Sequence, residues 1–392
     1  MIQEIFINEV PTSAYLHIPF CRRRCFYCDF PVSVVGDNKR GETSGAISRY
    51  VEVLCQEITI TPNFGKPLET IFFGGGTPSL LSASQLQQII DILNQYFGIS
   101  PSAEISMEMD PGTFDLQHLE SYHQSGVNRV SCGVQAFQET LLQVSGRSHN
   151  LTDTYSAIEL IRQVNIPNFS LDLISGLPNQ TLEMWQQSLE EAISLTPNHI
   201  SIYDLTIEPG TAFGRYFQPG DKPLPSDETT VHMYRMAQKV LTHAGYEHYE
   251  ISNYAKPGYQ CRHNRVYWEN RPYYAFGMGA ASYIQGKRFT RPRQTQTYYD
   301  WVTAGAVINC EVTPPDEVFL DTLMVGLRLA EGLDLTNLQD KFGIKKIEET
   351  LKILQPYMQK DWIIIQDNKL KLTDPEGFLF SNVILSQLFA YL

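Results

Sequence analysis

Three cysteines lie within eight residues near the start of the chain, in the segment Cys21-Arg-Arg-Arg-Cys25-Phe-Tyr-Cys28. Thiols at this density are typical of a metal centre or of a reactive thiol set. A closed structural zinc site needs a fourth ligand, for which His17 is the nearest candidate. An iron–sulfur cluster with three cysteine ligands leaves one iron open for another molecule. The spacing predicts a thiolate site and leaves cluster, zinc and uncoordinated thiols as alternatives.

The other cysteines and the net charge limit the classes of protein to which the chain can belong. Cys55, Cys132, Cys261 and Cys310 are dispersed, and a total of seven is odd, so a disulfide scaffold is disfavoured and a reducing, cytoplasmic location is expected. Net charge is −13, which disfavours a nucleic-acid partner but leaves peripheral membrane contact through a local basic patch open. We find no apolar run of membrane-spanning length and no secretory signal.

Short apolar, β-branched or aromatic runs alternate with amphipathic helical patterns through the first half of the chain. The expected strands are 14–20, 69–73, 104–109, 129–135, 169–174 and 199–207. The expected helices are 47–60, 84–96, 116–125, 153–163 and 182–195. This alternation predicts an α/β fold with a partial (β/α)6 TIM-like barrel, and an open doubly wound sheet is the alternative.

Nearly every expected strand ends in polar or glycine-rich residues, although strands buried on both faces are otherwise apolar. These ends carry His17, Cys21, residues 74–77, Glu108, Asp110, Gln135, Asp172, Tyr203 and Asp204. Barrel enzymes place their active sites at the C-terminal ends of the strands. We therefore expect these side chains to converge on one site.

The pattern changes after the proline-bearing stretch 223–227. The elements expected there are a helix over 228–244, a strand-like segment over 248–255 and an aromatic-rich stretch over 267–283. A different module is expected from about residue 304, with helices over 316–330, 335–341 and 344–359, a hairpin of 362–366 and 370–373, and a last helix. The expected parts are 1–210 (barrel), 211–303 (barrel extension) and 304–392 (C-terminal domain).

The order of elements in the C-terminal part is typical of a winged helix, a fold that often binds DNA. Residues 311–392, however, carry 13 acidic against 8 basic residues, a net charge of −5. This charge disfavours DNA reading and favours a structural or docking role for a mainly helical, winged-helix-like domain.

The motif C-x3-C-x2-C after the first expected strand, with Gly-Gly-Gly-Thr-Pro after the second, resembles the radical S-adenosylmethionine (SAM) superfamily. Within it, Tyr15-Leu-His-Ile-Pro-Phe-Cys21, Glu108-Met-Asp-Pro111 and Leu171-Asp-Leu-Ile-Ser-Gly-Leu-Pro178 resemble the HemN/HemW group. The motifs keep their order from about residue 14 into the C-terminal domain, so the resemblance covers nearly the whole chain.

The resemblance implies that Cys21, Cys25 and Cys28 hold a [4Fe–4S] cluster and that SAM chelates its fourth iron. The glycine run Gly74, Gly75 and Gly76 would let backbone groups approach the methionyl end of SAM, and Thr77 would start a helix. By alignment of the motifs, the further SAM-binding positions are Tyr15, Tyr27, Glu108, Gln135, Arg147, Asp172 and Thr206.

Two departures separate the chain from the oxygen-independent coproporphyrinogen III oxidases of the HemN branch. Those oxidases typically carry another cysteine two residues after the third cluster cysteine, where this chain has Phe30. They also carry a longer N-terminal segment, whereas this sequence begins twenty residues before Cys21. Both features resemble the HemW branch, which is regarded as haem-binding chaperones.

The third discriminator is Cys261-Arg-His-Asn-Arg-Val-Tyr-Trp268, which resembles the HemW-type H-N-x-x-Y-W signature. His263 suits an axial haem ligand, with Cys261 as a second option, and Tyr267 and Trp268 suit the faces or edges of a porphyrin. Arg262, Arg265 or Arg271 suit its propionates. From these residues alone, a His-Asn turn packed under an aromatic cluster is the alternative.

The expected function is a haem chaperone that binds haem as cargo, passes it to unidentified acceptor haemoproteins and retains the cluster and SAM site. The alternatives are a decarboxylating coproporphyrinogen III oxidase and a zinc-stabilised regulatory protein that acts through its C-terminal domain.

Overall fold

A nine-stranded sheet organises residues 9–391, the part of the chain that this computed structural model describes. The strand order is β11-β1-β4-β5-β6-β7-β8-β10-β9. The central strands run parallel to one another in chain order. They are β1 (Ser13–Ile18), β4 (Leu68–Gly75), β5 (Ile99–Met109), β6 (Arg129–Gln135), β7 (Asn168–Ser175) and β8 (His199–Asp204).

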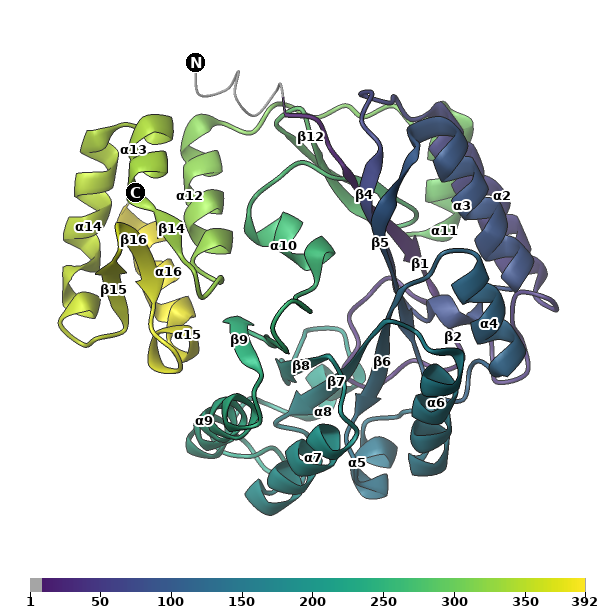
Figure 1. Cartoon of the computed structure of the whole chain (residues 1–392), viewed down its shortest axis with the longest axis horizontal. Coiled ribbons are helices and arrows are strands. Elements are labelled where there is room, and N and C mark those ends of the chain that lie inside the picture. Colours follow the sequence, from purple (N-terminus) through teal and green to yellow (C-terminus); the bar gives the residue numbers. More distant parts are fainter. Residues whose placement is uncertain (1–8, 392) are drawn as a thin grey trace.

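The main helices cover the outer, convex side of this sheet (Figure 1). They are α2 (Gly45–Ile60), α3 (Ala83–Phe97), α4 (Leu116–Gln124), α6 (Leu151–Val164), α7 (Leu182–Ser194) and α9 (Asp227–His243). Most begin at a Ser, Asp, Asn or Thr whose side chain accepts a hydrogen bond from the backbone three residues on, which satisfies an otherwise unpaired N–H. The predicted α/β partial barrel is confirmed.

Short elements lie in the connections between the barrel strands and in the stretch that leads to the C-terminal module. They are β2 (Phe20–Cys21), β3 (Ser33–Val34), η1 (Pro78–Leu80), α5 (Glu139–Val144), α8 (Ala212–Tyr216), α10 (Arg262–Trp268), β12 (Ala281–Ile284), β13 (Lys287–Thr290) and α11 (Thr295–Thr303).

Both edges of the sheet come from the second half of the chain. β11 (Tyr274–Phe276) adds in parallel to β1, whereas β10 (Asn253–Ala255) and β9 (Glu247–Glu250) add antiparallel beyond β8. The single strand expected over 248–255 is therefore wrong, because a turn and a register shift split it into two strands. The sheet curves like a barrel that stays open between β11 and β9.

Side chains alternate along the parallel strands between an apolar outer face and a polar inner face. On β5 the residues Ile105, Met107 and Met109 join the core beneath the helices. Glu104 and Glu108, at alternate positions, instead contact groups inside the barrel. Polar residues thus line the inner face over the whole length of the strands, and not only at the C-terminal ends where we expected them.

The C-terminal module consists of helices and a small antiparallel sheet of order β14-β16-β15. Its elements are α12 (Pro315–Gly326), β14 (Leu333–Asp334), α13 (Leu335–Phe342), α14 (Ile344–Met358), β15 (Ile363–Gln366), β16 (Lys369–Leu372), α15 (Glu376–Leu379) and α16 (Ser381–Tyr391). Asp367 and Asn368 both have positive φ, as a two-residue hairpin turn requires. The expected helical region with a hairpin is confirmed, although α12 ends four residues before Ala330.

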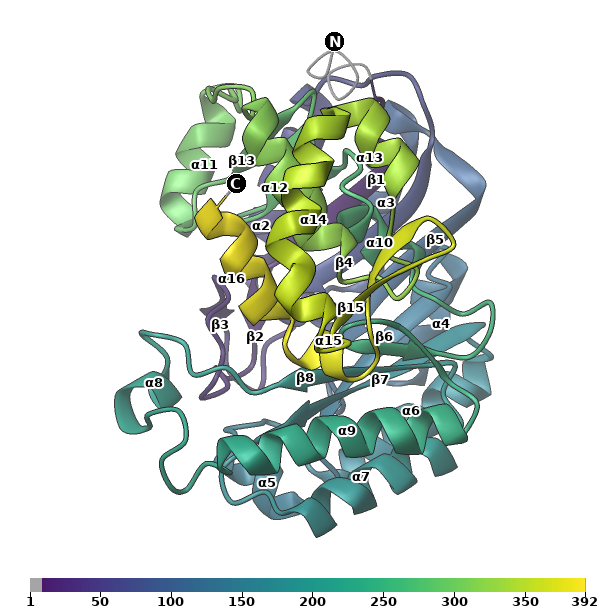
Figure 2. The same cartoon turned by 90° about the vertical axis from the view of Figure 1, so that its left-hand side faces the viewer.

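The module packs against the open side of the barrel, as both views of the molecule show (Figures 1 and 2). The guanidinium of Arg235 on α9 donates two hydrogen bonds to Glu376, at 2.7 and 2.8 Å. His248 on β9 lies 2.8 Å from Asp374. Among residues 9–391, no helix is both long and apolar enough to cross a membrane. The boundaries expected at residues 210 and 303 stay predictions.

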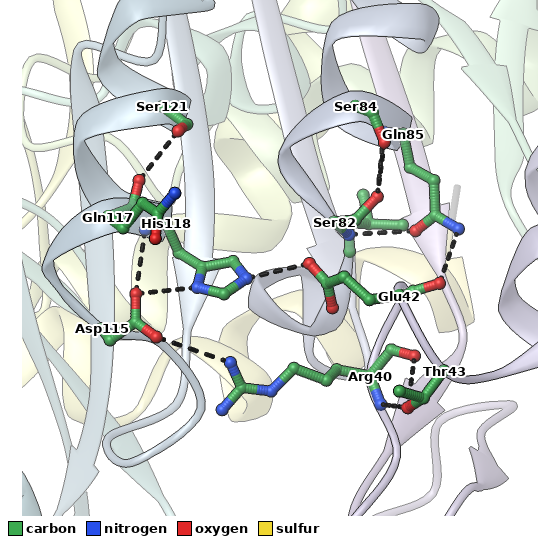
Figure 3. A network of polar contacts seen from close by, with 12 residues as sticks. Arg40, Glu42, Thr43, Ser82, Ser84, Gln85, Asp115, Gln117, His118 and Ser121 are labelled. Carbon is green, nitrogen blue, oxygen red and sulfur yellow. Dashed lines mark hydrogen bonds and ion pairs between the residues drawn. The ribbon is translucent and has the colours of Figure 1, made fainter.

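A polar network joins three βα loops at the rim of the barrel (Figure 3). The ring of His118 on α4 lies 2.8 Å from Asp115 and 2.9 Å from Glu42, and Arg40 lies 3.7 Å from the same Asp115. Burial lowers the pKa of His118, but the hydrogen bonds to Glu42 and Asp115 outweigh it and raise the pKa above its ordinary value. The charged imidazolium therefore stabilises the folded state.

We expect the contribution of His118 to be present below its unfolded pKa and lost as pH rises through the raised folded pKa. His118→Gln should lower the free energy of unfolding by roughly 1 kcal/mol or less near pH 5.5, and the deficit should shrink at pH 8.5. Urea titrations at both pH values measure this difference, with the exposed His232→Gln on α9 as the control. A deficit that grows with pH would contradict the assignment.

Candidate functional site

A cavity of about 530 Å³ lies at the C-terminal ends of the parallel strands. Its walls contain eleven of the residues expected at the cluster and SAM site: Cys21, Cys25, Tyr27, Cys28, Gly75, Gly76, Glu108, Gln135, Arg147, Asp172 and Thr206. Asp110, Tyr203 and Asp204 from the same strand ends also line it. Tyr15, Gly74 and Thr77 lie outside this lining, as does His17 among the expected strand ends. The strand ends thus converge as the sequence predicts.

Cys21 ends β2, and Cys25 and Cys28 lie on the loop between β2 and β3; all three are half-buried residues with free thiols. The loop turns tightly, since the N–H of Cys28 donates to the carbonyl of Cys25 at 3.2 Å. The side chain of Arg24 holds the next turn by donating to the carbonyls of Cys28 and Phe30, at 3.3 and 3.2 Å. Burial raises the pKa of Cys21 to about 12, so binding of a metal centre there would release a proton.

The donor set fits a multi-iron cluster better than a single ion. Among the residues described, no three His, Cys, Asp or Glu side chains are grouped closely enough to hold one metal ion. His17, the nearest fourth zinc ligand, is engaged elsewhere: its Nδ1 lies 3.0 Å from the Tyr15 hydroxyl and its Nε2 lies 3.2 Å from the carbonyl of Pro31. Three thiols around a shared cavity match the ligands of an iron–sulfur cluster with one open iron.

The glycine run at the end of β4 is required by packing against protein atoms. A Cβ on Gly75 would lie 2.4 Å from the ring of His17, and Gly75 also has φ of +113°. A Cβ on Gly76 would lie 2.7 Å from the carbonyl of Phe20. Glycine therefore allows this turn to lie against β1. The access of SAM to the backbone, which the sequence suggested for these glycines, stays a prediction.

Gly75→Ala should therefore destabilise the fold, because the added methyl strikes His17 and the residue must keep a positive φ. We expect a loss of about 2–3 kcal/mol in the free energy of unfolding, measured by denaturant titration. Gly45→Ala is the matched control, since a Cβ there meets nothing within 4 Å and alanine favours the first turn of α2. Equal stability of the two variants would remove the packing argument.

Two half-buried carboxyls form the floor of the cavity. Glu108 accepts a hydrogen bond from the N–H of Gly75 at 2.9 Å, and burial raises its pKa to about 8. Burial also raises the pKa of Asp172, to about 6, and the Ser131 hydroxyl contacts both of its oxygens, at 2.9 and 2.8 Å. Glu108 is thus largely protonated at neutral pH and Asp172 largely ionised, so the floor can both donate to and accept from a polar ligand.

Arg147 and Gln135 form the wall nearest to the cysteines. The Arg147 guanidinium pairs with Asp110 and donates to the carbonyl of Gly133 at 3.0 Å and to the Cys25 sulfur at 3.4 Å. Gln135 has a φ of +68°. It lies at a register shift in the pairing of β6 with β7, and such an irregularity changes the direction of a side chain. The Gln135 Oε1 and the Arg147 Nε are buried without a partner, which suits a bound polar ligand.

Three other predicted SAM positions have weaker or indirect roles. Tyr15 contacts His17 from outside the cavity lining, and burial raises the pKa of its hydroxyl. Thr77 donates to Asp110 at 3.0 Å and thereby supports the partner of Arg147. Thr206 lines the cavity from the loop after β8. The sequence assigned no ligand role to Asp110 or Ser131, although both share the inner face with Glu108.

His263 lies inside the barrel and outside the lining of the cavity. Its side chain is fully buried on α10, stacked on Phe72 with ring centroids 5.2 Å apart. Its Nδ1 lies 2.8 Å from the Thr70 hydroxyl, and its Nε2 lies 2.8 Å from the Tyr267 hydroxyl. Burial lowers the pKa of His263 to about 3, so the ring is neutral at physiological pH. Figure 1 shows α10 within the curve of the sheet.

The other residues expected to bind haem surround this helix without forming one open surface. The Cys261 thiol is buried 3.6 Å from Glu104, which also accepts from the backbone N–H of His263 at 3.0 Å. The Trp268 ring is half-buried, and the Arg328 guanidinium lies 5.4 Å from its centroid. As an axial ligand, His263 would therefore have to exchange the Tyr267 hydroxyl for iron.

Comparison with known proteins gives consistent matches along the chain. Residues 15–192 match the radical SAM superfamily, and residues 313–380 match the HemN C-terminal domain. Heme chaperone HemW of Synechocystis sp. is 47% identical over 98% of this chain and 97% of its own length. Heme chaperone HemW of Bacillus subtilis is 35% identical, over 95% and 97%.

A solved structure shares the whole architecture. Coproporphyrinogen III oxidase (HemN) from Escherichia coli superposes with a TM-score of 0.83 over 98% of this chain and 91% of that one. Its sequence identity is 24%, so the likeness shows the fold alone.

Proposed function

Because the chain belongs to the heme chaperone HemW family of the radical SAM superfamily, we propose that it binds haem and hands it to acceptor haemoproteins. The geometry of His263 is the observation that carries this proposal. We assign Nδ1–H as the donor to the Thr70 hydroxyl, which leaves the lone pair on Nε2, as hydrogen bonds to metal-bound histidines do. The neutral imidazole is thus prepared to bind iron.

We further propose that the cavity is a cluster and SAM site. Cys21, Cys25 and Cys28 would hold a [4Fe–4S] cluster, whose open iron would bind the amino and carboxylate groups of SAM. Glu108 and Asp172 would bind polar groups of SAM from the floor of the cavity. The Gln135 Oε1 and the Arg147 Nε, which have no hydrogen-bond partner, would bind SAM from the side. Tyr27 and Thr206 complete the proposed contacts, with Tyr15, Gly74, Gly75, Gly76 and Thr77 in support.

Coproporphyrinogen oxidation is the second candidate function. The observation in its favour is the intact polar cavity in a chain that shares the architecture of HemN. Against it, Phe30 occupies the position of the additional cysteine, with 60% of its surface exposed at the mouth of the cavity. An apolar side chain there offers no thiol for chemistry, so we favour the carrier.

The compartment and partners follow from the same proposal. All seven cysteines are free thiols, which suits the reducing cytoplasm. The acceptors would be haemoproteins that contact the chain transiently, either in solution or at a membrane surface. The acidic C-terminal module is the proposed docking part, and we propose no nucleic-acid partner for it.

A transfer experiment tests the proposed function. The haem-loaded chain is mixed in separate experiments with two acceptors. One is apomyoglobin, which takes up dissociated haem without recognising the chain, and the other is membranes from haem-depleted cells that contain apo-cytochromes. Direct hand-over predicts a transfer rate to the membranes that rises with their concentration and exceeds the rate to apomyoglobin. A rate that equals spontaneous dissociation for both acceptors would show a haem-binding protein without chaperone activity.

A further inference from the structure

A second, smaller cavity of about 130 Å³ lies beside α10, apart from the cluster site. Its walls are Ser13 and Glu69–Thr70 at the starts of β1 and β4, together with Arg262, Arg265 and Arg271. The lining residues include three arginines and one glutamate, a formal excess of two positive charges before their contacts with residues outside the lining are considered. A cavity of this size and charge suits a small anionic group.

The surrounding contacts hold the arginines without neutralising all of them. Arg265 is fixed by Glu269 and Glu331, neither of which lines the cavity. Arg271 has its Nε 2.8 Å from Glu269, but without hydrogen-bond geometry, so this buried N–H has no hydrogen-bond acceptor. Arg262 donates only to the carbonyl of Ser102, at 2.8 Å, and within residues 9–391 it pairs with no carboxylate. Arg262 and Arg271 therefore retain donors for a ligand.

The cavity lies next to the proposed haem ligand. Thr70 lines it, and the hydroxyl of the same Thr70 contacts Nδ1 of His263 at 2.8 Å. The arginines and His263 also share the short helix α10 and its C-terminal turn, so one segment carries both an imidazole and an anion pocket. A ligand that combines a metal with carboxylates at its edge matches this pairing of groups.

We propose that this arginine pocket binds a carboxylate of the cargo, a propionate of haem, while His263 binds the iron. The proposal rests on the proposed haem-carrier function and adds what the chain recognises besides the metal. Guanidiniums bind carboxylates through paired, charge-assisted hydrogen bonds, and the pocket would thereby select porphyrins that carry free carboxylates.

Titrations with haem and with haem dimethyl ester test the proposal, because the ester keeps the iron and the ring but lacks the carboxylates. The wild-type protein should bind haem about tenfold or more tightly than the ester, as judged from the Soret band. Arg262→Gln combined with Arg271→Gln should weaken haem binding by a similar factor and leave the affinity for the ester unchanged. Arg235→Gln, whose arginine pairs with Glu376 at similar exposure, is the matched control.

The outcomes separate this proposal from the proposed function. Equal affinity of the wild-type protein for haem and ester would overturn the pocket assignment and leave the haem carrier standing. Failure to bind either porphyrin would overturn both. A third arm uses inorganic phosphate: if it raises the unfolding temperature of the wild type but not of the double variant, while haem and ester bind equally, the pocket takes a free anion and the propionate assignment is wrong.

Discussion

Replacement of His263 by alanine is expected to weaken haem binding by about a hundredfold and to shift the Soret band, because the substitution removes the proposed iron ligand. The cluster absorption should persist, since His263 does not line the cavity with the cysteines. Trp268→Ala should weaken binding less, because it removes ring contact and keeps the iron bond. Spectrophotometric titration of each variant with haem measures the haem affinity, the position of the Soret band and the cluster absorption.

Tyr267→Phe is the matched control for this prediction. In the structure the Tyr267 hydroxyl occupies Nε2 of His263, and haem has to displace it. Phenylalanine keeps the ring but removes the competing hydroxyl, so haem affinity should stay equal to that of the wild type or increase. Loss of haem binding in Tyr267→Phe, with full binding in His263→Ala, would reverse the assignment and make the tyrosine the ligand.

The second large effect concerns the cysteines of the cavity. Cys21→Ala, Cys25→Ala and Cys28→Ala should each abolish the [4Fe–4S] absorption after anaerobic reconstitution, because each removes one of only three thiols in the lining. Metal analysis should find iron and sulfide in the wild type and little zinc.

The dispersed cysteines provide the control for that experiment. Cys55 and Cys132 are buried in the core, and Cys310 lies on the connection to the C-terminal module. A protein with all three replaced by alanine should keep its cluster, although the two buried substitutions will reduce its stability somewhat. Loss of the cluster from this folded variant would show that our ligand assignment is wrong.

The sequence predicted the barrel well because the barrel rests on local patterns. Alternating apolar residues, strand lengths and helix caps are all visible within windows of a few residues, and the polar strand ends correctly indicated one cavity. The sequence did not predict the polar contacts inside the barrel at the N-terminal part of the strands, because the residues that form them are distant in the chain. The Glu104–Arg129 pair and the contact of Glu104 with α10 form only when β5, β6 and residue 263 meet.

Three features that the sequence did not reveal have the same physical origin. The sequence did not predict α10, which has only seven residues and no side-chain N-cap bond, so it lacks the usual signal of a helix start. The reason for glycine at position 75 depends on the ring of His17, which is 58 residues away in the chain but adjacent in space. The enclosure of His263 by Thr70 and Tyr267 likewise depends on tertiary packing.

One measurement tests the central claim most directly. The reconstituted wild-type protein is incubated anaerobically with a reductant, SAM and coproporphyrinogen III, and in parallel with haem, and the porphyrins are separated and quantified. Our account predicts a stable protein–haem complex and coproporphyrinogen that is recovered unchanged. Conversion of coproporphyrinogen to protoporphyrinogen, with two decarboxylations per substrate, would contradict the account and identify the chain as an oxidase.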